Sequence, residues 1–585
     1  MKRNRIIFTL FIAFAVLISA CSDEFLTREP LGQFGQPSLE NQDGVEGILL
    51  GTYAMIDGAG LDGTADWNVT VENWAFNIAS DDALKGTDAG DQPEQSFIEA
   101  YDYQAFNGHI TNRWRSLFKG VARANDAITS ARRVEDIPED RRAQIIAEAT
   151  FLRGIFHMEA RKMWRMPPYI GDDVYDINDV ESTKVPNDRE IWPLIEADFE
   201  AAAAVLPETP SKGQVGRPTS WAAKAFLAKA KMYQGWNEDG SANTAKLQEA
   251  KVLLDEIVDS GKYSLVPKFD DNFKVATRNN PESIFEIQYA VSSAADGASA
   301  RGMGLAHPYT DPWGCCGFYQ VSQNLVNAYR TEGGLPLLDT FDDADVTSAT
   351  NPTTTLSTYT EPLDPRLDHT VGRPGILYKG FKIYQTDFVR DLSYAGPFFS
   401  QKHVAEEFGP GGWGNLTANN YRYMRYGMVI LWLAEAEVEL GNLERARELI
   451  NLIRERASNP ADFVQKAEQG TERNQFTLVE GEAAANYEIS QYNVPFADQA
   501  TARKAVRFET RLEFAMEGHR YWDLVRWGVA AETLNAYIAS ESNHRQYLAG
   551  KSFTKGKNEY FPIPSQAIGR SAIDGAPTLT QDPAY

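Results

Sequence analysis

The chain has 585 residues, and its 81 acidic against 57 basic side chains give a formal net charge of −24 at pH 7. A surface this acidic repels nucleic acids and anionic lipid headgroups, so we exclude both as partners. Hydrophobic residues make up 43% of the chain, with 12 Trp, 25 Tyr and 30 Phe, which is enough for a large core. Because no Gly/Ser-rich or Pro-rich linker divides the sequence, we predict a single large domain.

The N-terminus has the pattern of a secretory signal. A short basic flank precedes an apolar run of roughly a dozen residues, whereas a membrane span takes about 20. The run ends in LISAC at residues 17–21, an aliphatic residue and small ones before a cysteine, which resembles the lipobox of bacterial lipoproteins. We therefore predict that residues 1–20 are removed and that Cys21, the start of the domain over residues 21–585, carries acyl chains such as palmitate. A plain cleavage site with an incidental cysteine is the alternative.

Apolar residues recur at steps of three and four over residues 109–133 and 139–166, which predicts two helices. Residues 221–260 and 425–457 each predict a helical hairpin. In the second hairpin, a twelve-residue step and then steps of four and three match the spacing of a tetratricopeptide repeat. The residues at this spacing are Ala434, Ala446, Ile450 and Ile453. Generic antiparallel helices would need the same small residues at their contacts, and they remain the alternative.

The segment over about residues 262–420 differs from the rest of the chain. It is rich in Gly, Pro, Asp, Asn and aromatic residues, with only short runs typical of strands, such as SIFEIQYAV at residues 283–291. Long irregular segments in compact proteins are usually functional. We therefore predict a mainly α-helical fold, in which a scaffold of tetratricopeptide-like helical pairs carries an irregular, aromatic-rich loop region with short strands.

Two adjacent cysteines, Cys315 and Cys316, lie in this region within the sequence WGCCGFYQ. The secretory signal implies an oxidising compartment, and lipidation of Cys21 would leave these two thiols only each other. We predict a vicinal disulfide, with Gly314 and Gly317 allowing the backbone to turn around it. A pair of buried free thiols is the alternative, and two thiols alone make a poor zinc site because zinc takes four ligands.

Three glutamates near the C-terminus lie at i, i+4 and i+8 of a predicted helix, and paired carboxylates are what glycoside hydrolysis requires. Arginines alternate with these acids, which favours a structural ion-pair network with low carboxyl pKa values over a proton donor. We assign to this network Glu509, Arg511, Glu513, Glu517, Arg520, Asp523 and Arg526. The seven histidines form no HExxH motif, and the sequence predicts no catalytic residue, no metal and no other cofactor.

Aromatic side chains with nearby amides or carboxylates form three clusters in the predicted loops. Flat rings can stack on the apolar faces of sugars while polar side chains bind the hydroxyl groups. Our candidates for ligand binding are Trp67, Trp74, Asp81, Asp82, Tyr309, Trp313, Phe318, Tyr319, Trp413 and Asn415. For any one of these aromatics, a place in the core or in a protein interface is the alternative.

The segment RFETRLEFAMEGHRYWDLVRWG at residues 507–528, together with the lipobox, resembles the SusD/RagB family of surface lipoproteins. The family signature is E-R-x-x-E, a hydrophobic run and then E-G-x-R-x-x-D-L-x-R-W-G. This chain departs from it at Thr510, which separates Glu509 from Arg511. Further landmarks follow in the family's order, and they are EATFLRGIFHMEARKMW at 148–164, Asp364-Pro365-Arg366, LWLAEAEVELGN at 431–442 and Tyr560-Phe561-Pro562-Ile563-Pro564.

The resemblance implies a non-catalytic protein on the outer face of the outer membrane that caps a SusC-like TonB-dependent transporter. It also implies four tetratricopeptide-like helical pairs and a loop region that binds a nutrient, usually a glycan. Ser22-Asp23-Glu24 resembles the signal that exports lipoproteins to the surface of Bacteroidetes-type bacteria. The alternatives are a peptide-binding, RagB-like member of the same family and a surface glycoside hydrolase.

Overall fold

The computed structural model describes residues 40–56, 74–289, 305–310, 313–346, 359–404, 418–472 and 475–585. The predicted signal peptide and the lipid-anchor residue Cys21 lie outside these ranges. Three of the ligand-binding candidates, Trp67, Trp413 and Asn415, also lie outside them. Across the residues described, no helix combines the length and the apolar composition needed to cross a membrane.

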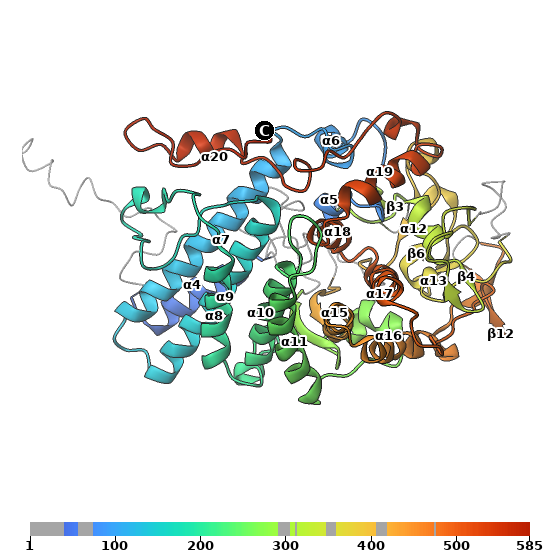
Figure 1. Cartoon of the computed structure of the whole chain (residues 1–585), viewed down its shortest axis with the longest axis horizontal. Helices are drawn as coiled ribbons and strands as arrows, with labels where there is room; N and C mark the ends of the chain where they lie inside the picture. The colour runs from blue at the N-terminus through green and yellow to red at the C-terminus, as the bar shows by residue number, and fades with distance from the viewer. Residues whose placement is uncertain are drawn as a thin grey trace, which may run out of the picture.

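A row of helices runs across the molecule (Figure 1). It consists of α4 (Gln42–Tyr53), α7 (Gly108–Arg133), α8 (Glu139–Met163), α9 (Trp192–Val205), α10 (Ser220–Tyr233), α11 (Thr244–Asp259), α15 (Tyr426–Glu439), α16 (Leu443–Ala457) and α17 (Gln499–Phe514). From α7 to α11 each helix packs against the next, and α15 packs against α11, α16 and α17. The predicted mainly α-helical scaffold of helical pairs is confirmed.

The first long pair, α7 and α8, corresponds to the helices predicted over residues 109–133 and 139–166. The side chain of Asn107 caps α7 by accepting hydrogen bonds from the backbone amides of its first turn, at 3.0 Å from His109 N. The two helices pack closely at Gly120, where an added Cβ would lie 2.7 Å from the ring of Phe156. Glycine at this position therefore sets the close contact between the pair.

The hairpin predicted over residues 425–457 is present as α15 and α16. The small residues Ala434 and Ala446 are fully buried, which is where a helical pair needs short side chains. Gly441 has a φ of +86° in the turn between the helices, a conformation that glycine adopts without a steric penalty. The spacing that predicted the hairpin therefore reflects the contact between its two helices.

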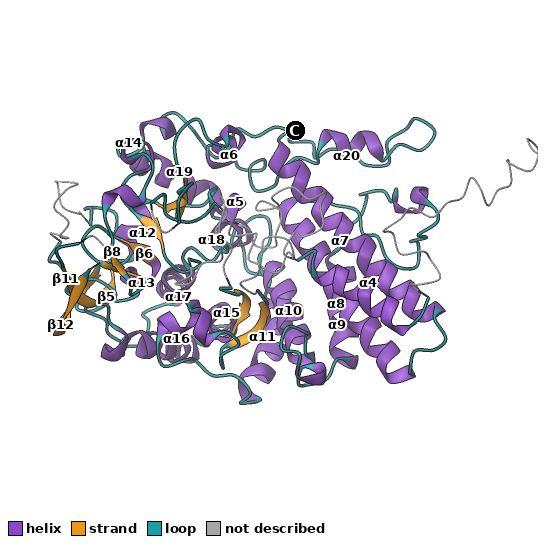
Figure 2. Cartoon of the chain, turned by 180° about the vertical axis from the view of Figure 1, so that it is seen from behind, coloured by secondary structure: helices purple, strands orange, loops and turns teal. Residues whose placement is uncertain are grey.

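The predicted loop region contains short strands, and most strands lie at the end of the molecule away from α7 to α9 (Figure 2). A four-stranded antiparallel sheet has the order β1 (Ala83–Gly86), β3 (Phe318–Val321), β9 (Phe399–Ser400) and β6 (Val371–Gly372). The two-stranded sheets are β2 (Ser283–Ile287) with β10 (Tyr421–Arg425), β4 (Thr331–Glu332) with β5 (Leu335–Pro336), β7 (Leu377–Tyr378) with β8 (Lys382–Ile383), and β11 (Gln465–Gln469) with β12 (Phe476–Ala483). The four-stranded sheet joins the N-terminal part of the chain to the loop region.

Short helices complete the fold. They are α5 (Trp74–Asn77), α6 (Pro93–Glu99), α12 (Gln323–Ala328), α13 (Leu367–Thr370), α14 (Leu392–Ala395), α18 (Arg520–Arg526), α19 (Ala530–Glu541) and α20 (Ser565–Arg570). Beside the main core, a second core of buried residues lies in the loop region. It contains Trp313, Tyr378, Tyr384, Phe388, Val389, Phe399 and Val404.

Candidate functional site

The three glutamates of the C-terminal motif are buried on α17 and directly after it. Their cationic partners come from other elements and are Arg366, Lys402, Arg425, Arg454 and Arg456. Glu513 lies 2.7 Å from Arg425 at its closest oxygen, in an ion pair that is fully enclosed. The arrangement joins α17 to β10, α16 and the loop region through charge.

These contacts determine the protonation of the carboxylates. Burial alone would raise the pKa of Glu513, but Arg456, Arg425 and Arg366 together hold the pKa of that carboxyl well below its usual range. The pKa of Glu517 is lowered in the same way, against burial, by Arg425 and Lys402. Both carboxyls are therefore ionised at neutral pH, and neither holds the proton that a general acid needs.

Asp81 and Asp82 also belong to the buried ion pairs, which corrects their assignment as ligand-binding candidates. Asp81 accepts hydrogen bonds from Arg520 at 2.8 Å and also pairs with Arg511 at 3.3 Å. Asp82 accepts from Arg511 at 2.8 Å. Because both aspartates are at most 1% exposed, a ligand at the surface does not reach them.

The remaining charged residues of the motif lie on α18. Asp523 and Arg526 pair with each other at 2.7 Å, and Arg526 also binds Glu435 of α15. All seven assigned residues thus lie in ion pairs, and among the ion pairs described here that of Asp523 with Arg526 joins two members of the set.

Four aromatic candidates are core residues in the structure. Trp74 of α5 lies 5.7 Å from Phe318 and 5.9 Å from Tyr319, measured between ring centroids, and all three rings are at most 1% exposed. Trp313 is 2% exposed and packs against Phe388 in the second core. Their expected role as ligand platforms is corrected, because the rings lie in the two hydrophobic cores instead of facing solvent.

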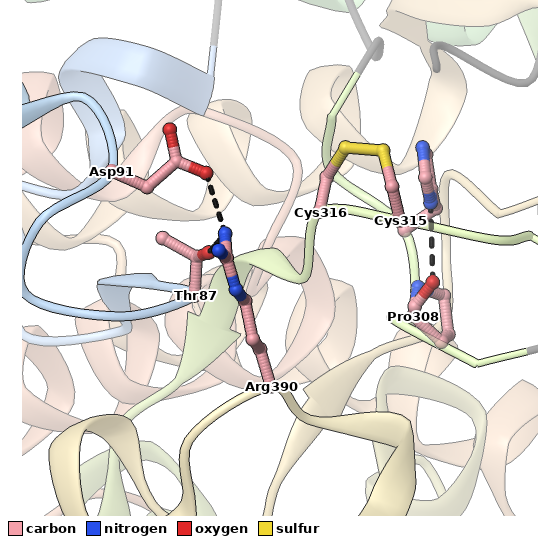
Figure 3. The surroundings of a disulfide bond; sticks show 7 residues. Thr87, Asp91, Pro308, Cys315, Cys316 and Arg390 are labelled. Carbon is pink, nitrogen blue, oxygen red and sulfur yellow. Dashed lines mark hydrogen bonds and ion pairs between the residues drawn. A yellow bond between two sulfur atoms is a disulfide. The ribbon is translucent and has the colours of Figure 1, made fainter. Parts of the chain in front are cut away.

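Tyr309 is the ligand-binding candidate that remains exposed among the described residues, at 42%. The guanidinium of Arg390 lies 5.6 Å from the centre of its ring, within the range of a cation–π contact. Arg390 in turn pairs with Asp88 at 2.9 Å and with Asp91 at 2.8 Å, and Figure 3 shows the pair with Asp91. These four residues, which we call the Tyr309 surface, place one aromatic ring beside three partly exposed charged groups.

The sulfur atoms of Cys315 and Cys316 are joined in a disulfide beside this surface (Figure 3). The flanking glycines Gly314 and Gly317 have φ values of +86° and +78°, the left-handed conformation that allows the tight turn. The carbonyl of Gly317 accepts from the amide of Thr87 at 2.7 Å, which ties the turn to the end of β1. The cysteine turn, residues 314–317, is therefore fixed to the end of β1, shortly before Asp88 and Asp91 of the Tyr309 surface.

A buried histidine contacts the same turn. His307 is 4% exposed, and burial lowers the pKa of its imidazole to about 4. Its Nδ1 lies 3.2 Å from the carbonyl oxygen of Pro308, and its backbone carbonyl accepts from the amide of Gly317 at 3.0 Å. The described residues provide no hydrogen-bond partner for its Nε2.

Sequence reasoning found Tyr309 and the two cysteines but missed Asp88, Asp91 and Arg390. The two aspartates lie in a polar segment that gives no sign of a site, and Arg390 is separated from Asp91 by 299 residues along the chain. A compositional clue exists only for the aspartates, which lie in the acidic stretch from residue 81 to 91. Their pairing with Arg390 depends on the tertiary fold.

Comparisons with known proteins identify the family. A family model described as "SusD family" matches residues 281–585, and one described as "Starch-binding associating with outer membrane" matches residues 62–232. A SusD-like protein of Bacteroides ovatus is 25% identical over 278 residues, which cover 47% of this chain and 48% of that protein. The matched segment therefore spans about half the length of that relative.

Solved structures show the same fold over most of the chain. A SusD superfamily protein from Bacteroides vulgatus is 20% identical, with a TM-score of 0.66 over 94% of this chain and 100% of that one. Surface glycan-binding protein A from Bacteroides thetaiotaomicron, in complex with laminarihexaose, is 22% identical, with a TM-score of 0.60 over 93% of this chain and 100% of that one. Since the first family model covers more than half of the sequence, the chain belongs to the SusD/RagB family that its C-terminal motif resembles.

Proposed function

We propose that this chain is a non-catalytic lipoprotein of the cell surface, which captures a glycan and delivers it to a SusC-like TonB-dependent transporter. The observation that carries the proposal is the Tyr309 surface, an exposed ring beside a guanidinium and two carboxylates. The family model described as starch-binding and the laminarihexaose complex of a structural neighbour support a carbohydrate as the ligand.

The chemistry of a sugar suits this surface. Its apolar C–H face can lie against the ring of Tyr309, whose exposed part would otherwise contact water. The side chains of Asp88, Asp91 and Arg390 are 29%, 34% and 35% exposed, so each retains accessible polar atoms for hydroxyl groups. Because Arg390 is already held by the two aspartates, little side-chain entropy is lost when a ligand binds.

The cysteine turn supports the same role. It is fixed to the end of β1 by a backbone hydrogen bond. A Cβ added at Gly317 would lie 3.6 Å from the Cβ of Tyr309, so the turn lies close to the base of that side chain. A rigid turn next to Tyr309 keeps the surface in one conformation before the ligand arrives. A preformed site loses less conformational entropy when it binds a ligand.

The absence of catalysis is proposed from the carboxylates of the C-terminal motif and of the Tyr309 surface. Glu513 and Glu517 are enclosed and ionised, and they contact arginines instead of solvent. Asp88 and Asp91 both form ion pairs with the guanidinium of Arg390. A glycoside hydrolase needs one carboxyl that remains protonated beside one that does not.

Two assays of the purified protein test the class of function. Affinity electrophoresis in gels that contain laminarin, starch or other soluble glycans should show retardation by at least one glycan and none by peptide ligands. Product analysis after long incubation should find no new reducing ends. Release of reducing sugar, or binding of peptides with no glycan bound, would contradict the proposal.

The partner is tested by purification from membranes. An affinity-tagged chain, extracted from its native membrane in mild detergent, should carry a TonB-dependent barrel protein that mass spectrometry identifies. The tagged chain recovered alone under conditions that preserve other outer-membrane complexes would contradict the transporter partnership.

A further inference from the structure

The imidazole of His307 has an arrangement that glycan binding does not explain. Its Nδ1 lies 3.2 Å from the carbonyl oxygen of Pro308, and a carbonyl can only accept a hydrogen bond. The proton is therefore on Nδ1, and Nε2 carries a free lone pair. That nitrogen is buried and finds no partner in the described part of the chain, although buried polar atoms are nearly always bonded.

A ring nitrogen of His307 lies close to two sulfur atoms. The ligand atoms of His307, Cys315 and Cys316 are all within 4.8 Å of one another. Bonds of about 2.3 Å to sulfur and 2.0 Å to nitrogen, as in zinc sites, would separate the donors of a three-coordinate ion by roughly 4 Å. Only small movements of the side chains are needed to reach that geometry once the two sulfurs are no longer bonded to each other.

The histidine also has the supporting contact that is typical of metal ligands. A ligating imidazole usually donates its second N–H to a carboxylate or a backbone carbonyl, which fixes the tautomer and the ring orientation. The carbonyl of Pro308 accepts this hydrogen bond from His307. The backbone carbonyl of His307 binds the amide of Gly317, so the histidine and the cysteine turn are held together independently of the disulfide.

We propose that the reduced form of the Cys315–Cys316 pair, together with His307 Nε2, binds one Cu(I) ion. A small thiol reductant supplies the two electrons. The Cys315–Cys316 disulfide and two thiol groups of the reductant give two cysteine thiols and one disulfide of the reductant. Cu(I) then displaces the two thiol protons and bonds to both sulfurs and to the nitrogen. Cys315 is half-buried, which leaves one sulfur of the pair within reach of a small thiol.

Copper(I) fits this donor set better than zinc does. Soft thiolate ligands select Cu(I), which is stable with three ligands, whereas structural zinc is almost always four-coordinate. The described residues bring together two sulfurs and one nitrogen in this group, and no carboxylate belongs to it. The site is separate from the proposed glycan surface, because none of its three donors belongs to the Tyr309 surface.

The test uses the full-length protein, purified in its oxidised form. One sample is reduced with dithiothreitol and freed of it by anaerobic gel filtration, and both samples are titrated against the Cu(I)–bicinchoninate complex. The reduced sample should remove one equivalent of Cu(I) from bicinchoninate, and the oxidised sample should remove none. Equal uptake by the two samples, or no uptake by either, overturns the proposal.

Variants identify the three donors. The double variant Cys315→Ser/Cys316→Ser should lose the binding, and His307→Ala should weaken it at least about tenfold, as loss of a ligand or of its support usually does. His109→Ala, which removes another buried histidine from α7, is the matched control and should bind as the unmodified chain does. Equal affinity of the His307 variant and this control overturns the assignment of the nitrogen.

X-ray absorption of the copper-loaded, reduced chain keeps the test independent of variant folding. The spectrum should show two sulfur neighbours and one nitrogen neighbour. A copper ion with sulfur neighbours alone, or with none, overturns the site. Uptake of Zn(II) in preference to Cu(I) by the reduced chain contradicts the choice of metal.

Discussion

At the scale of single residues, the C-terminal motif and the conformation of the core depend on buried charge. Arg425 is fully buried and contacts Glu282, Glu513 and Glu517, so three carboxylates share one guanidinium. A buried ion pair is weak evidence for net stabilisation, but removal of one partner leaves uncompensated charge in the interior. Most charged residues of the motif therefore depend on oppositely charged partners from distant segments of the chain.

Replacement of Arg425 by methionine is expected to destabilise the fold by about 3–5 kcal/mol, because the glutamates around it lose their counter-charge. Arg445→Met is the matched control, since Arg445 pairs with Glu448 where both side chains are about half exposed. The control should change stability by less than about 1 kcal/mol. Urea unfolding measures both variants, and equal effects would contradict the account of the buried charge.

A second residue-scale prediction concerns Glu99. Burial raises the pKa of this carboxyl to about 7. Hydrogen bonds from the hydroxyl of Tyr547 and the amide of Lys85, and the charge of Lys85, oppose the rise in pKa. The negative charge of Glu541 adds to it. The folded chain thus holds a proton that the unfolded chain releases near pH 4.5, so the stabilisation is complete below pH 4.5 and is lost as the pH rises through 7.

Glu99→Gln removes this titration and keeps an oxygen for the same two donors. Between pH 5 and 8, the free energy of unfolding of the unmodified chain should fall relative to that of the variant by on the order of 2 kcal/mol. Urea unfolding at a series of pH values measures the difference. A difference that is constant over this range, or that grows in the opposite direction, would show that Glu99 is already ionised at pH 5.

At the scale of elements, local patterns predicted the helical pairs well. The steps between Ala434, Ala446 and the isoleucines after them arise from contacts within one hairpin, so they can be read from neighbouring residues. The sheet β1–β3–β9–β6 was not predictable, because its strands are short and come from segments far apart. The buried partners of Asp81 were hidden for the same reason, since Arg520 lies 439 residues away along the chain.

The contact between α7 and α8 gives the element-scale prediction. Gly120→Ala should destabilise the fold by about 1–3 kcal/mol, because its Cβ would meet the ring of Phe156 at 2.7 Å. Gly47→Ala in α4 is the matched control, since an added Cβ there meets no atom within 4 Å. That helical substitution should stabilise by about 0.5–1 kcal/mol. Thermal unfolding compares the two, and destabilisation of equal size by both would contradict the close packing.

At the scale of the whole molecule, the proposed anchor would determine where the acidic chain resides. With a net charge of −24, the protein gains nothing from electrostatic attraction to anionic lipids, so we propose that its membrane attachment depends on acylation of Cys21. Cys21→Ala should therefore yield a soluble periplasmic protein that is not labelled at the cell surface. Thr27→Ala, which leaves the lipobox intact, is the control. Surface labelling of intact cells and fractionation distinguish the results, and a Cys21 variant that remains at the surface would contradict the anchor.

The most direct measurement of the proposed function is the affinity of a Tyr309→Ala variant for whichever glycan retards the unmodified chain in gels. Isothermal titration calorimetry should show at least about tenfold weaker binding, a loss of about 1.4 kcal/mol, because the stacking ring is gone. Phe106→Ala is the control, because it removes another exposed ring, 78% exposed, that is not part of the Tyr309 surface. The neighbouring residue Ala105 accepts a hydrogen bond from the amide of Ser565 at the start of α20. This variant should bind the glycan as the unmodified chain does. Equal affinity of the two variants would contradict the assignment of glycan capture to the Tyr309 surface.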